Sequence, residues 1–275
     1  MRELSARYPV WFCDVWGVLH NGIKPYEQAV KALTRHRRNG GTVVLVTNAP
    51  RTRPEVEKQI AALGVDPQSH DAIVTSGDVT RVLMTEHGGG HVFHLGPARN
   101  LSIFEGLEIV RTSLSEAKAV VCTGLFDDRT EIPRDYEPLL RDMKSRDLVM
   151  ICANPDRIVR IGDHLQYCAG SLAEAYLAMG GSVLMAGKPF RPIYELARRE
   201  AESRRSQSLA LDGILAIGDG PLTDIRGAAD FGIDAVLIAD GVTDPSAGLA
   251  VVEQEVKQIV PEAHIVKTMH HLAWD

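Results

Sequence analysis

Six polar or charged residues each end or follow a short apolar run, a placement that suits a site for a phosphorylated ligand. These residues are Asp14, Thr47, Asn48, Lys188, Asp219 and Asp224. In open parallel sheets, ligands bind at the carboxyl ends of the strands. Carboxylates are oxygen ligands that suit Mg²⁺, and a lysine ammonium or a threonine hydroxyl can hold phosphoryl oxygens. The pattern therefore predicts a magnesium and phosphate site at one edge of a sheet.

Taken singly, each of these residues has a simpler explanation. An aspartate such as Asp219 after a strand is often a turn or helix-cap residue. Thr47 and Asn48 form a common strand end, and Lys188 has the character of a surface lysine. Their shared placement and their order along the chain favour the joint interpretation.

The apolar runs alternate with amphipathic stretches in the rhythm of a parallel α/β sheet. Expected strands in the first third are Val10–Asp14, Gly40–Asn48 and Asp71–Ser76, with a helix over Tyr26–Arg38 and another that begins near Pro54. The last third adds expected strands at Ser182–Gly187, Gly213–Asp219, Asp234–Gly241 and Ala263–Thr268, with a helix over Pro192–Arg204. Three more runs lie in the middle, at His91–Gly96, Lys118–Gly124 and Asp147–Asn154. We expect an α/β fold with a Rossmann-like parallel-sheet core, interrupted by a second α/β module.

Composition restricts the classes of function. The chain has 275 residues and a formal net charge of -6, so a basic surface for nucleic acid is not expected. No apolar run reaches the roughly 18 residues of a membrane span, and Asp14 interrupts any signal-like segment. The four cysteines are far apart, and three of them sit inside apolar runs, where they are expected to be small buried hydrophobic residues. We expect a cytoplasmic protein that binds neither nucleic acid nor membrane; the oligomeric state stays open, a homodimer included.

Four motifs resemble, in order, those of the haloacid dehalogenase superfamily. They are FCDVWGV, LVTNAPR, GKP and GDGPLTDIRGA. A long insert between the second and third motifs, together with CANPD and CAGSLAEAY, is similar to the type IIA subclass of NagD-like sugar phosphatases. The similarity extends over nearly the whole chain. It implies a core formed by residues 1–77 and 187–275, with an inserted α/β cap at 78–186.

The resemblance also implies a nucleophile and a metal site. Asp14 would attack phosphorus and form an aspartyl-phosphate, which divides one difficult displacement into two easier ones. Asp14, Asp219 and the backbone carbonyl of Trp16 would bind Mg²⁺. Asp224 would orient the site without being a direct ligand of the metal.

Phosphate and substrate contacts follow from the same resemblance. Thr47, Asn48 and Lys188 would hold the phosphoryl group of a small phosphorylated metabolite, and Lys188 would offset negative charge. The insert would form a lid that excludes water. Its substrate loop would be 156–164, where three residues either meet an anionic substrate or are ordinary surface charges: Arg157, Arg160 and His164.

Trp16 departs from the family pattern. Phosphatases of the family have a second aspartate at this position, which protonates the leaving oxygen and later activates water. Three explanations compete: a substrate with a good leaving group, a substitute acid such as His20, or a protein that binds phosphate compounds with slow or no turnover. For His20, the interpretation as an exposed loop histidine is favoured over that as a substitute acid. A metal-free dehalogenase is a further alternative, but it would not need both Asp219 and Asp224.

Overall fold

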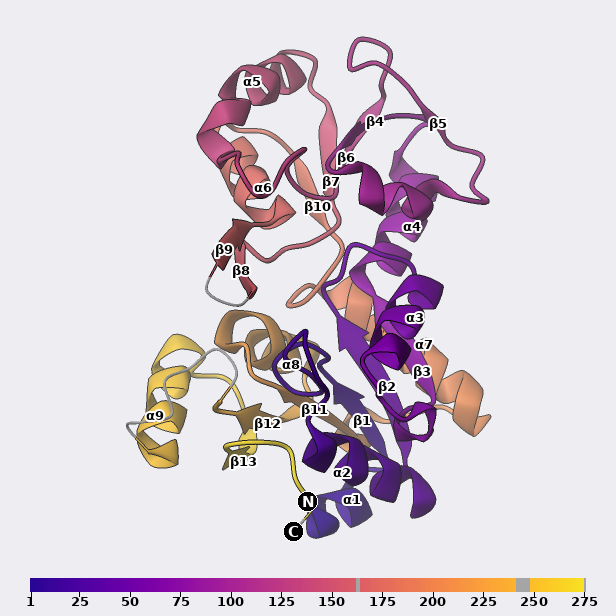
Figure 1. Ribbon diagram of the computed structural model, residues 1–275, viewed down its shortest axis with the longest axis vertical. Coiled ribbons are helices and arrows are strands. Elements are labelled where there is room, and N and C mark those ends of the chain that lie inside the picture. Colours follow the sequence, from indigo (N-terminus) through magenta and orange to yellow (C-terminus); the bar gives the residue numbers. More distant parts are fainter. Residues whose placement is uncertain (162–163, 241–247, 275) are drawn as a thin grey trace. The chain divides into compact units, whose positions relative to one another are not determined.

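The computed structural model describes residues 1–161, 164–240 and 248–274, and the chain divides into two compact units (Figure 1). The first unit comprises Met1–Thr47, Pro54–Val74 and Lys188–Asp275, and the second comprises Asn48–Arg53 and Thr75–Gly187. Each unit has its own sheet. The grouping of the short segment Asn48–Arg53 with the second unit had no signal in the sequence.

The sheet of the first unit has the strand order β13-β12-β11-β1-β2-β3. Its strands are β1 (Val10–Cys13), β2 (Thr42–Thr47), β3 (Ala72–Thr75), β11 (Ile214–Gly218), β12 (Asp234–Ile238) and β13 (Ile265–Met269). The central strand β1 pairs in parallel with β2 and β11, and every residue of β1 and β2 is buried. Near-continuous apolar runs are typical of parallel strands covered on both faces. The prediction of a Rossmann-like parallel α/β fold is confirmed.

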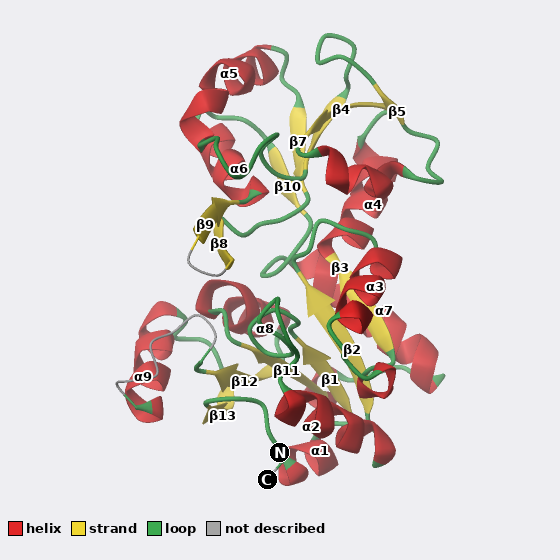
Figure 2. Ribbon diagram, viewed as in Figure 1, coloured by secondary structure: helices red, strands yellow, loops and turns green. Residues whose placement is uncertain are grey.

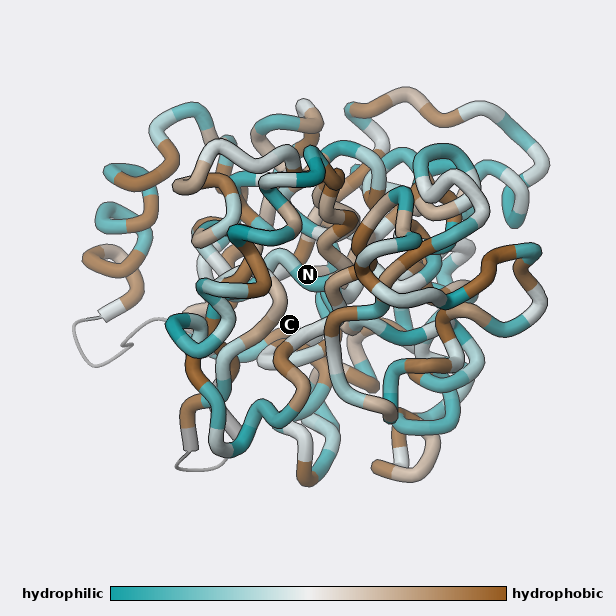
Figure 3. Tube along the Cα trace, turned by 90° about the horizontal axis from the view of Figure 1, so that it is seen from above, coloured by the Kyte–Doolittle hydropathy of each residue, from teal (hydrophilic) through white to brown (hydrophobic). Residues whose placement is uncertain are grey.

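Helices flank this sheet, as Figure 2 shows. They are α1 (Arg2–Arg7), α2 (Glu27–Arg38), α3 (Arg53–Ala62), α7 (Arg191–Arg205), α8 (Arg226–Phe231) and α9 (Leu249–Ile259). Both α2 and α7 pack against β2. Hydrophobic and hydrophilic residues alternate along α9 (Figure 3), where Val252 and Val256 are buried. No helix within the described ranges has the length and apolar character needed to cross a membrane.

The second unit is built around a sheet with the order β10-β7-β6-β4-β5, in which neighbouring strands are parallel. Its elements are α4 (Ser76–His87), β4 (His91–Leu95), β5 (Val110–Arg111), β6 (Ala119–Cys122), α5 (Glu137–Ser145), β7 (Val149–Cys152), β8 (Ile158–Ile161), β9 (His164–Tyr167), α6 (Ala169–Ala178) and β10 (Val183–Met185). A separate core includes Leu95, Val120, Met150 and Tyr176. The expectation for the cysteines is confirmed, since all four are unpaired and buried.

The strand β10 corrects one part of the sequence interpretation. The run Ser182–Gly187 was expected to continue the rhythm of the first sheet, but β10 pairs with β7 in the second unit. Lys188 therefore does not follow a strand of the first sheet; it lies in the turn that leads from β10 to α7. The apolar pattern of a short buried strand predicts burial on both faces but does not identify its neighbours.

Candidate active site

The loop after β1 brings Asp14 close to Asp219. The Asp14 N–H donates to the carbonyl oxygen of Ile217 at 2.8 Å, which extends the pairing of β1 with β11 by one residue. Further along the loop, Gly17 has a φ of +84°, and a Cβ atom there would lie 2.2 Å from Oδ2 of Asp219. Glycine tolerates this φ and leaves room for the carboxylate. The loop backbone is thus packed directly against the acidic side chain that follows β11.

Lys188 lies between two carboxylates. Its Nζ donates to Oδ1 of Asp14 at 2.5 Å and to Oδ1 of Asp224 at 2.7 Å, and all three residues are buried. Burial by itself lowers the pKa of Lys188, but the two carboxylates outweigh this effect and raise that pKa well above its ordinary value. The ammonium group is therefore charged at any working pH.

The three aspartates form one acidic cluster. One carboxylate oxygen from each of Asp14, Asp219 and Asp224 lies within 4.8 Å of the others. Burial, and then the neighbouring carboxylates, raises the pKa of Asp219 to about 9. Burial likewise raises the pKa of Asp14 above its ordinary value, although Lys188 opposes the shift. Three carboxylates against one ammonium leave two excess negative charges when all are ionised, and a divalent cation that prefers oxygen ligands fits this donor set.

Asp224 differs from the other two aspartates because both of its carboxylate oxygens are engaged. Oδ1 accepts from Lys188, and Oδ2 accepts from the Gly220 N–H and the Thr223 hydroxyl, each at 3.2 Å. The Tyr194 hydroxyl donates to the Asp224 carbonyl oxygen at 3.4 Å. Sequence reasoning missed Thr223 and Tyr194. Thr223 stands in the last motif beside Asp224, whereas Tyr194 lies on α7 and carried no local signal.

Trp16 and His20 form a compact pair in the loop after β1. Their rings meet edge-on with centroids 5.4 Å apart, and a Cβ on Gly22 would lie 2.4 Å from Cη2 of the indole. His20 is buried, and its Nδ1 accepts the Gly22 N–H at 3.0 Å. The interpretation of His20 as an exposed loop histidine is therefore wrong. Burial lowers the pKa of His20, so the imidazole is neutral and weakly suited to donate a proton.

Thr47 and Asn48 fall in different units. Thr47 is the buried last residue of β2, and it reaches the same sheet edge as Asp14 because β2 is the parallel neighbour of β1. Asn48 belongs to the second unit, where its Nδ2 donates to Oδ1 of Asp156 at 2.9 Å. No motif or spacing in the sequence predicts the contact of Asn48 with Asp156. A phosphate-binding role for Thr47 and Asn48 stays a prediction.

The expected substrate loop contains β8, which pairs antiparallel with β9. Arg157 precedes β8; its side chain is exposed and its Nε lies 2.8 Å from Oε2 of Glu174. Arg160 lies in β8 and His164 in β9, but both side chains fall outside the described part of the chain. A substrate role for these three residues stays a prediction.

Comparison with known proteins identifies the family. The haloacid dehalogenase-like hydrolase model matches residues 11–110, and a HAD-hydrolase-like model matches residues 185–269. A hydrolase of the haloacid dehalogenase-like family from Brucella suis 1330 is 47% identical, with 99% of this chain and 98% of that chain covered and a TM-score of 0.89. The chain belongs to the haloacid dehalogenase-like hydrolase family, and the resemblance seen in its motifs is confirmed.

More distant structures share the fold. A possible sugar phosphatase from Cytophaga hutchinsonii is 21% identical to this chain, with a TM-score of 0.81. The match covers 100% of this chain and 97% of that chain. A glycerol phosphate phosphatase from Mycobacterium tuberculosis, solved in complex with magnesium, is 22% identical to this chain, with a TM-score of 0.73. The match covers 98% of this chain and 77% of that chain. A search among curated proteins finds no match.

Proposed function

We propose that this chain is a Mg²⁺-dependent phosphohydrolase that acts on a small phosphorylated metabolite through an aspartyl-phosphate on Asp14. The observation that carries the proposal is the buried cluster in which Lys188 contacts Asp14 and Asp224 while Asp219 lies alongside. A fixed ammonium group lets a carboxylate approach an anionic phosphoryl group because it offsets the charge of both. The names of the two phosphatases that share the fold agree with this chemistry.

The proposed reaction has two displacements at phosphorus. In the first, an oxygen of Asp14 bonds to phosphorus while the bond to the leaving-group oxygen breaks, and that oxygen departs with the electron pair. In the second, water attacks the same phosphorus atom, inorganic phosphate departs, and the Asp14 carboxylate is regenerated. Lys188 stays protonated in both steps, and Thr47 is assigned to hold phosphoryl oxygens.

The donor set supports a magnesium site. Asp14, Asp219 and the backbone carbonyl of Trp16 would hold the ion, which when bound would neutralise the excess negative charge around the phosphoryl group. Within the described ranges, no side chain donates a hydrogen bond to the carboxylate of Asp219, which favours it as a direct ligand. Asp224 is assigned to position Lys188, because both of its oxygens are already engaged.

Trp16 restricts the substrates in this proposal. An indole neither protonates a leaving oxygen nor takes a proton from water, and the buried, neutral His20 beside it is a poor replacement. Leaving groups that depart without a proton are therefore favoured. We infer that acyl phosphates, phosphoanhydrides and activated aryl phosphates react well, whereas alkyl phosphates such as sugar phosphates react slowly.

Trp16 also favours a second candidate function, that of a phosphometabolite-binding protein with little or no turnover. Such a protein would keep the metal and phosphate contacts and would lack only the proton transfer. A dehalogenase is not proposed, because the cluster retains Asp219 and Asp224 beside Asp14, and a metal-free reaction needs neither.

A phosphate-release panel tests the proposal. The substrates are acetyl phosphate, nitrophenyl phosphate, pyrophosphate and glycerol phosphate at equal concentrations, each with Mg²⁺ or with EDTA. We expect release only with Mg²⁺, fastest from the activated substrates. Equal release in EDTA would contradict the metal requirement. Absence of release from all four, with Mg²⁺ binding seen by calorimetry, would favour the binding protein.

A further inference from the structure

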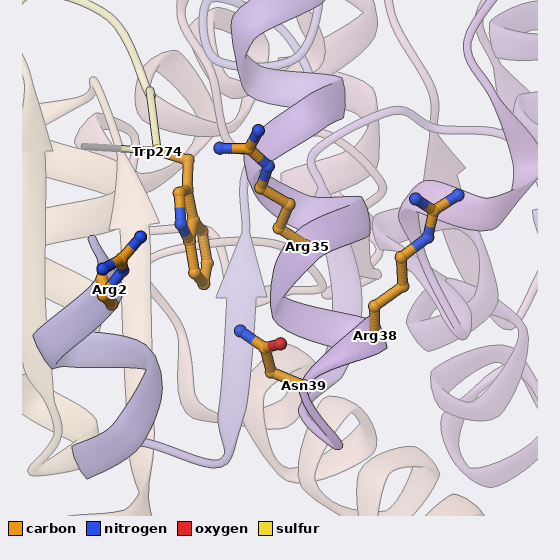
Figure 4. A pocket seen from close by; sticks show the side chains of 5 residues that line it. All are labelled: Arg2, Arg35, Arg38, Asn39 and Trp274. Atoms are coloured by element: carbon orange, nitrogen blue, oxygen red, sulfur yellow. The ribbon is translucent and has the colours of Figure 1, made fainter.

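Charged side chains of the first unit are packed closely at one end of its strands and exposed at the other. At the amino ends, a pocket is lined by Arg2, Arg35, Arg38, Asn39 and Trp274 (Figure 4). Its three arginines are exposed, and Figure 4 shows Arg2 and Arg35 on opposite sides of the indole of Trp274. At the carboxyl ends, by contrast, Asp224 and Lys188 are buried and in contact. A fixed geometry that chemistry can use is therefore found around Asp224.

The carboxylate of Asp224 is enclosed by the end of β11 and by the turn that follows this strand. A Cβ on Gly218, the last residue of β11, would lie 2.2 Å from Cγ of Asp224. Because glycine has no side chain, the backbone of the strand approaches the carboxylate closely. Oδ2 accepts hydrogen bonds from the Gly220 N–H and the Thr223 hydroxyl. The carboxylate is thus held in one position, with Oδ1 directed to Lys188.

The main chain of Asp224 lies in a single π-helical turn, Pro221–Ile225. The N–H of Ile225 donates to the carbonyl oxygen of Gly220, five residues earlier, at 3.1 Å, and α8 begins at the next residue. Single π turns interrupt the regular ladder of helical hydrogen bonds and often occur at functional sites. Contacts from other elements therefore matter more for the position of this turn than for that of a regular helix. The Tyr194 hydroxyl makes such a contact, because it donates to the carbonyl oxygen of Asp224 at 3.4 Å.

Tyr194 is itself firmly held. It lies on α7, is buried, and stacks on Phe231 with ring centroids 5.4 Å apart. A Cβ on Gly227 would lie 2.3 Å from the hydroxyl oxygen of Tyr194, so α8 leaves room for this hydroxyl because residue 227 is glycine. Burial, and then the Asp224 carboxylate, raises the pKa of Tyr194 well above its ordinary value. The hydroxyl therefore keeps its proton and remains a hydrogen-bond donor.

We propose that Tyr194 is a positioning residue, which fixes the backbone of Asp224 and thereby places the ammonium group of Lys188 against Asp14. The contacts form a chain: the Tyr194 hydroxyl holds the Asp224 carbonyl, the Asp224 carboxylate holds Lys188, and Lys188 contacts Asp14. This inference rests on the proposed function, in which Lys188 offsets the charge between Asp14 and the phosphoryl group. A small displacement of a catalytic group slows a reaction without weakening substrate binding to the same degree. Loss of the hydroxyl should therefore lower kcat more than it alters KM.

Tyr194→Phe removes the hydroxyl and keeps the ring, and Tyr176→Phe is its matched control. Tyr176 is a buried tyrosine of the second unit whose hydroxyl also donates to a main-chain carbonyl, that of Leu148, at 2.6 Å. Both variants lose a buried hydrogen bond, so both should melt at a slightly lower temperature. Hydrolysis of acetyl phosphate with saturating Mg²⁺ separates them. We expect Tyr194→Phe to lower kcat by about three- to tenfold with KM changed by less than about twofold, and Tyr176→Phe to keep the kcat of the wild type.

A second measurement does not depend on hydrolysis. The NMR signal of the Lys188 ammonium group reports on its contacts, and Lys188→Arg identifies this signal by its loss. We expect Tyr194→Phe to shift the signal and Tyr176→Phe to leave it in place. If the wild type releases no phosphate, the proposed function fails, and the NMR comparison alone decides whether Tyr194 positions Lys188.

With an active wild type, the proposal requires both the fall in kcat and the shift of the Lys188 signal in Tyr194→Phe. Either change without the other would overturn it. An equal fall in kcat in Tyr194→Phe and Tyr176→Phe would also overturn it, since loss of a buried hydroxyl anywhere would then have the same effect.

Discussion

At the residue scale, Trp16 decides which phosphate esters the proposed active site can cleave. General acid–base help contributes typically 10²–10⁴-fold to such reactions. Trp16→Asp should therefore raise kcat/KM for glycerol phosphate by one order of magnitude or more and leave kcat/KM for acetyl phosphate nearly unchanged, because kcat/KM reports the first displacement and not the later attack of water, which is common to both substrates. The ratio of kcat/KM for the two substrates, measured in wild type and variant, checks this prediction.

The stability of the same variant must be measured beside its kinetics. Trp16 is half-buried and packs against Gly22 and His20, so its removal leaves a void that costs on the order of 2–4 kcal/mol. A wild type that already hydrolyses glycerol phosphate as fast as acetyl phosphate would contradict the proposed effect of Trp16 on substrate choice. His20→Ala would then show whether His20 supplies the proton.

At the scale of elements, the loop after β1 controls the position of the acidic cluster through Gly17. Gly17→Ala should lower the melting temperature and abolish phosphate release, because a Cβ would lie 2.2 Å from Oδ2 of Asp219 at a φ of +84°. Backbone strain alone costs on the order of 1–3 kcal/mol. Gly64→Ala is the matched control, since Gly64 has a φ of +88° with no atom within 4 Å of its added Cβ. If both variants lose stability but both keep phosphate release, the close approach of Gly17 to Asp219 is not needed for activity.

The strands were predictable from sequence because their apolar runs are continuous and end at polar residues, as β1 does at Asp14. The convergence of Asp14, Asp219 and Asp224 follows from the parallel order of β1 and β11. Other features depend on tertiary contacts between distant segments. The burial of His20, the contact of Tyr194 with Asp224 and the pairing of β10 with β7 are of this kind. The local pattern of apolar and polar residues contains no information on these tertiary contacts.

At the scale of the whole molecule, the second unit has its own sheet and its own buried core. Replacing residues 75–187 by a short linker should leave a folded first unit, because a domain with its own core folds independently. We expect this shortened protein to hydrolyse nitrophenyl phosphate with Mg²⁺ and to lose discrimination among larger substrates. Circular dichroism measures whether the shortened protein is folded, and the substrate panel measures its hydrolysis and its discrimination among substrates. A shortened chain that is unfolded would count against the insert as a separate cap domain.

The acidic cluster should also make stability depend on pH. The folded state holds the proton of Asp219 up to a pKa of about 9, against an ordinary value of 3.8, so proton binding favours folding at low pH. As the pH rises toward and through the pKa of Asp219 in the folded state, the free energy of unfolding falls by up to about 1.4 kcal/mol per pH unit. Thermal melting in EDTA between pH 7 and pH 9 should show a falling midpoint that Mg²⁺ restores. Asp219→Asn should lose most of this slope; an unchanged slope would contradict the assignment to Asp219.

In the proposed mechanism, Asp14 is the nucleophile of a magnesium-dependent phosphohydrolase. The most direct test is release of inorganic phosphate from acetyl phosphate by wild type and Asp14→Asn, side by side and with saturating Mg²⁺. Circular dichroism establishes that both proteins are folded. An amide cannot form the acyl phosphate, so we expect steady release by the wild type and release at the level of the protein-free control by Asp14→Asn. Undiminished release by Asp14→Asn would contradict the role of Asp14 as the nucleophile.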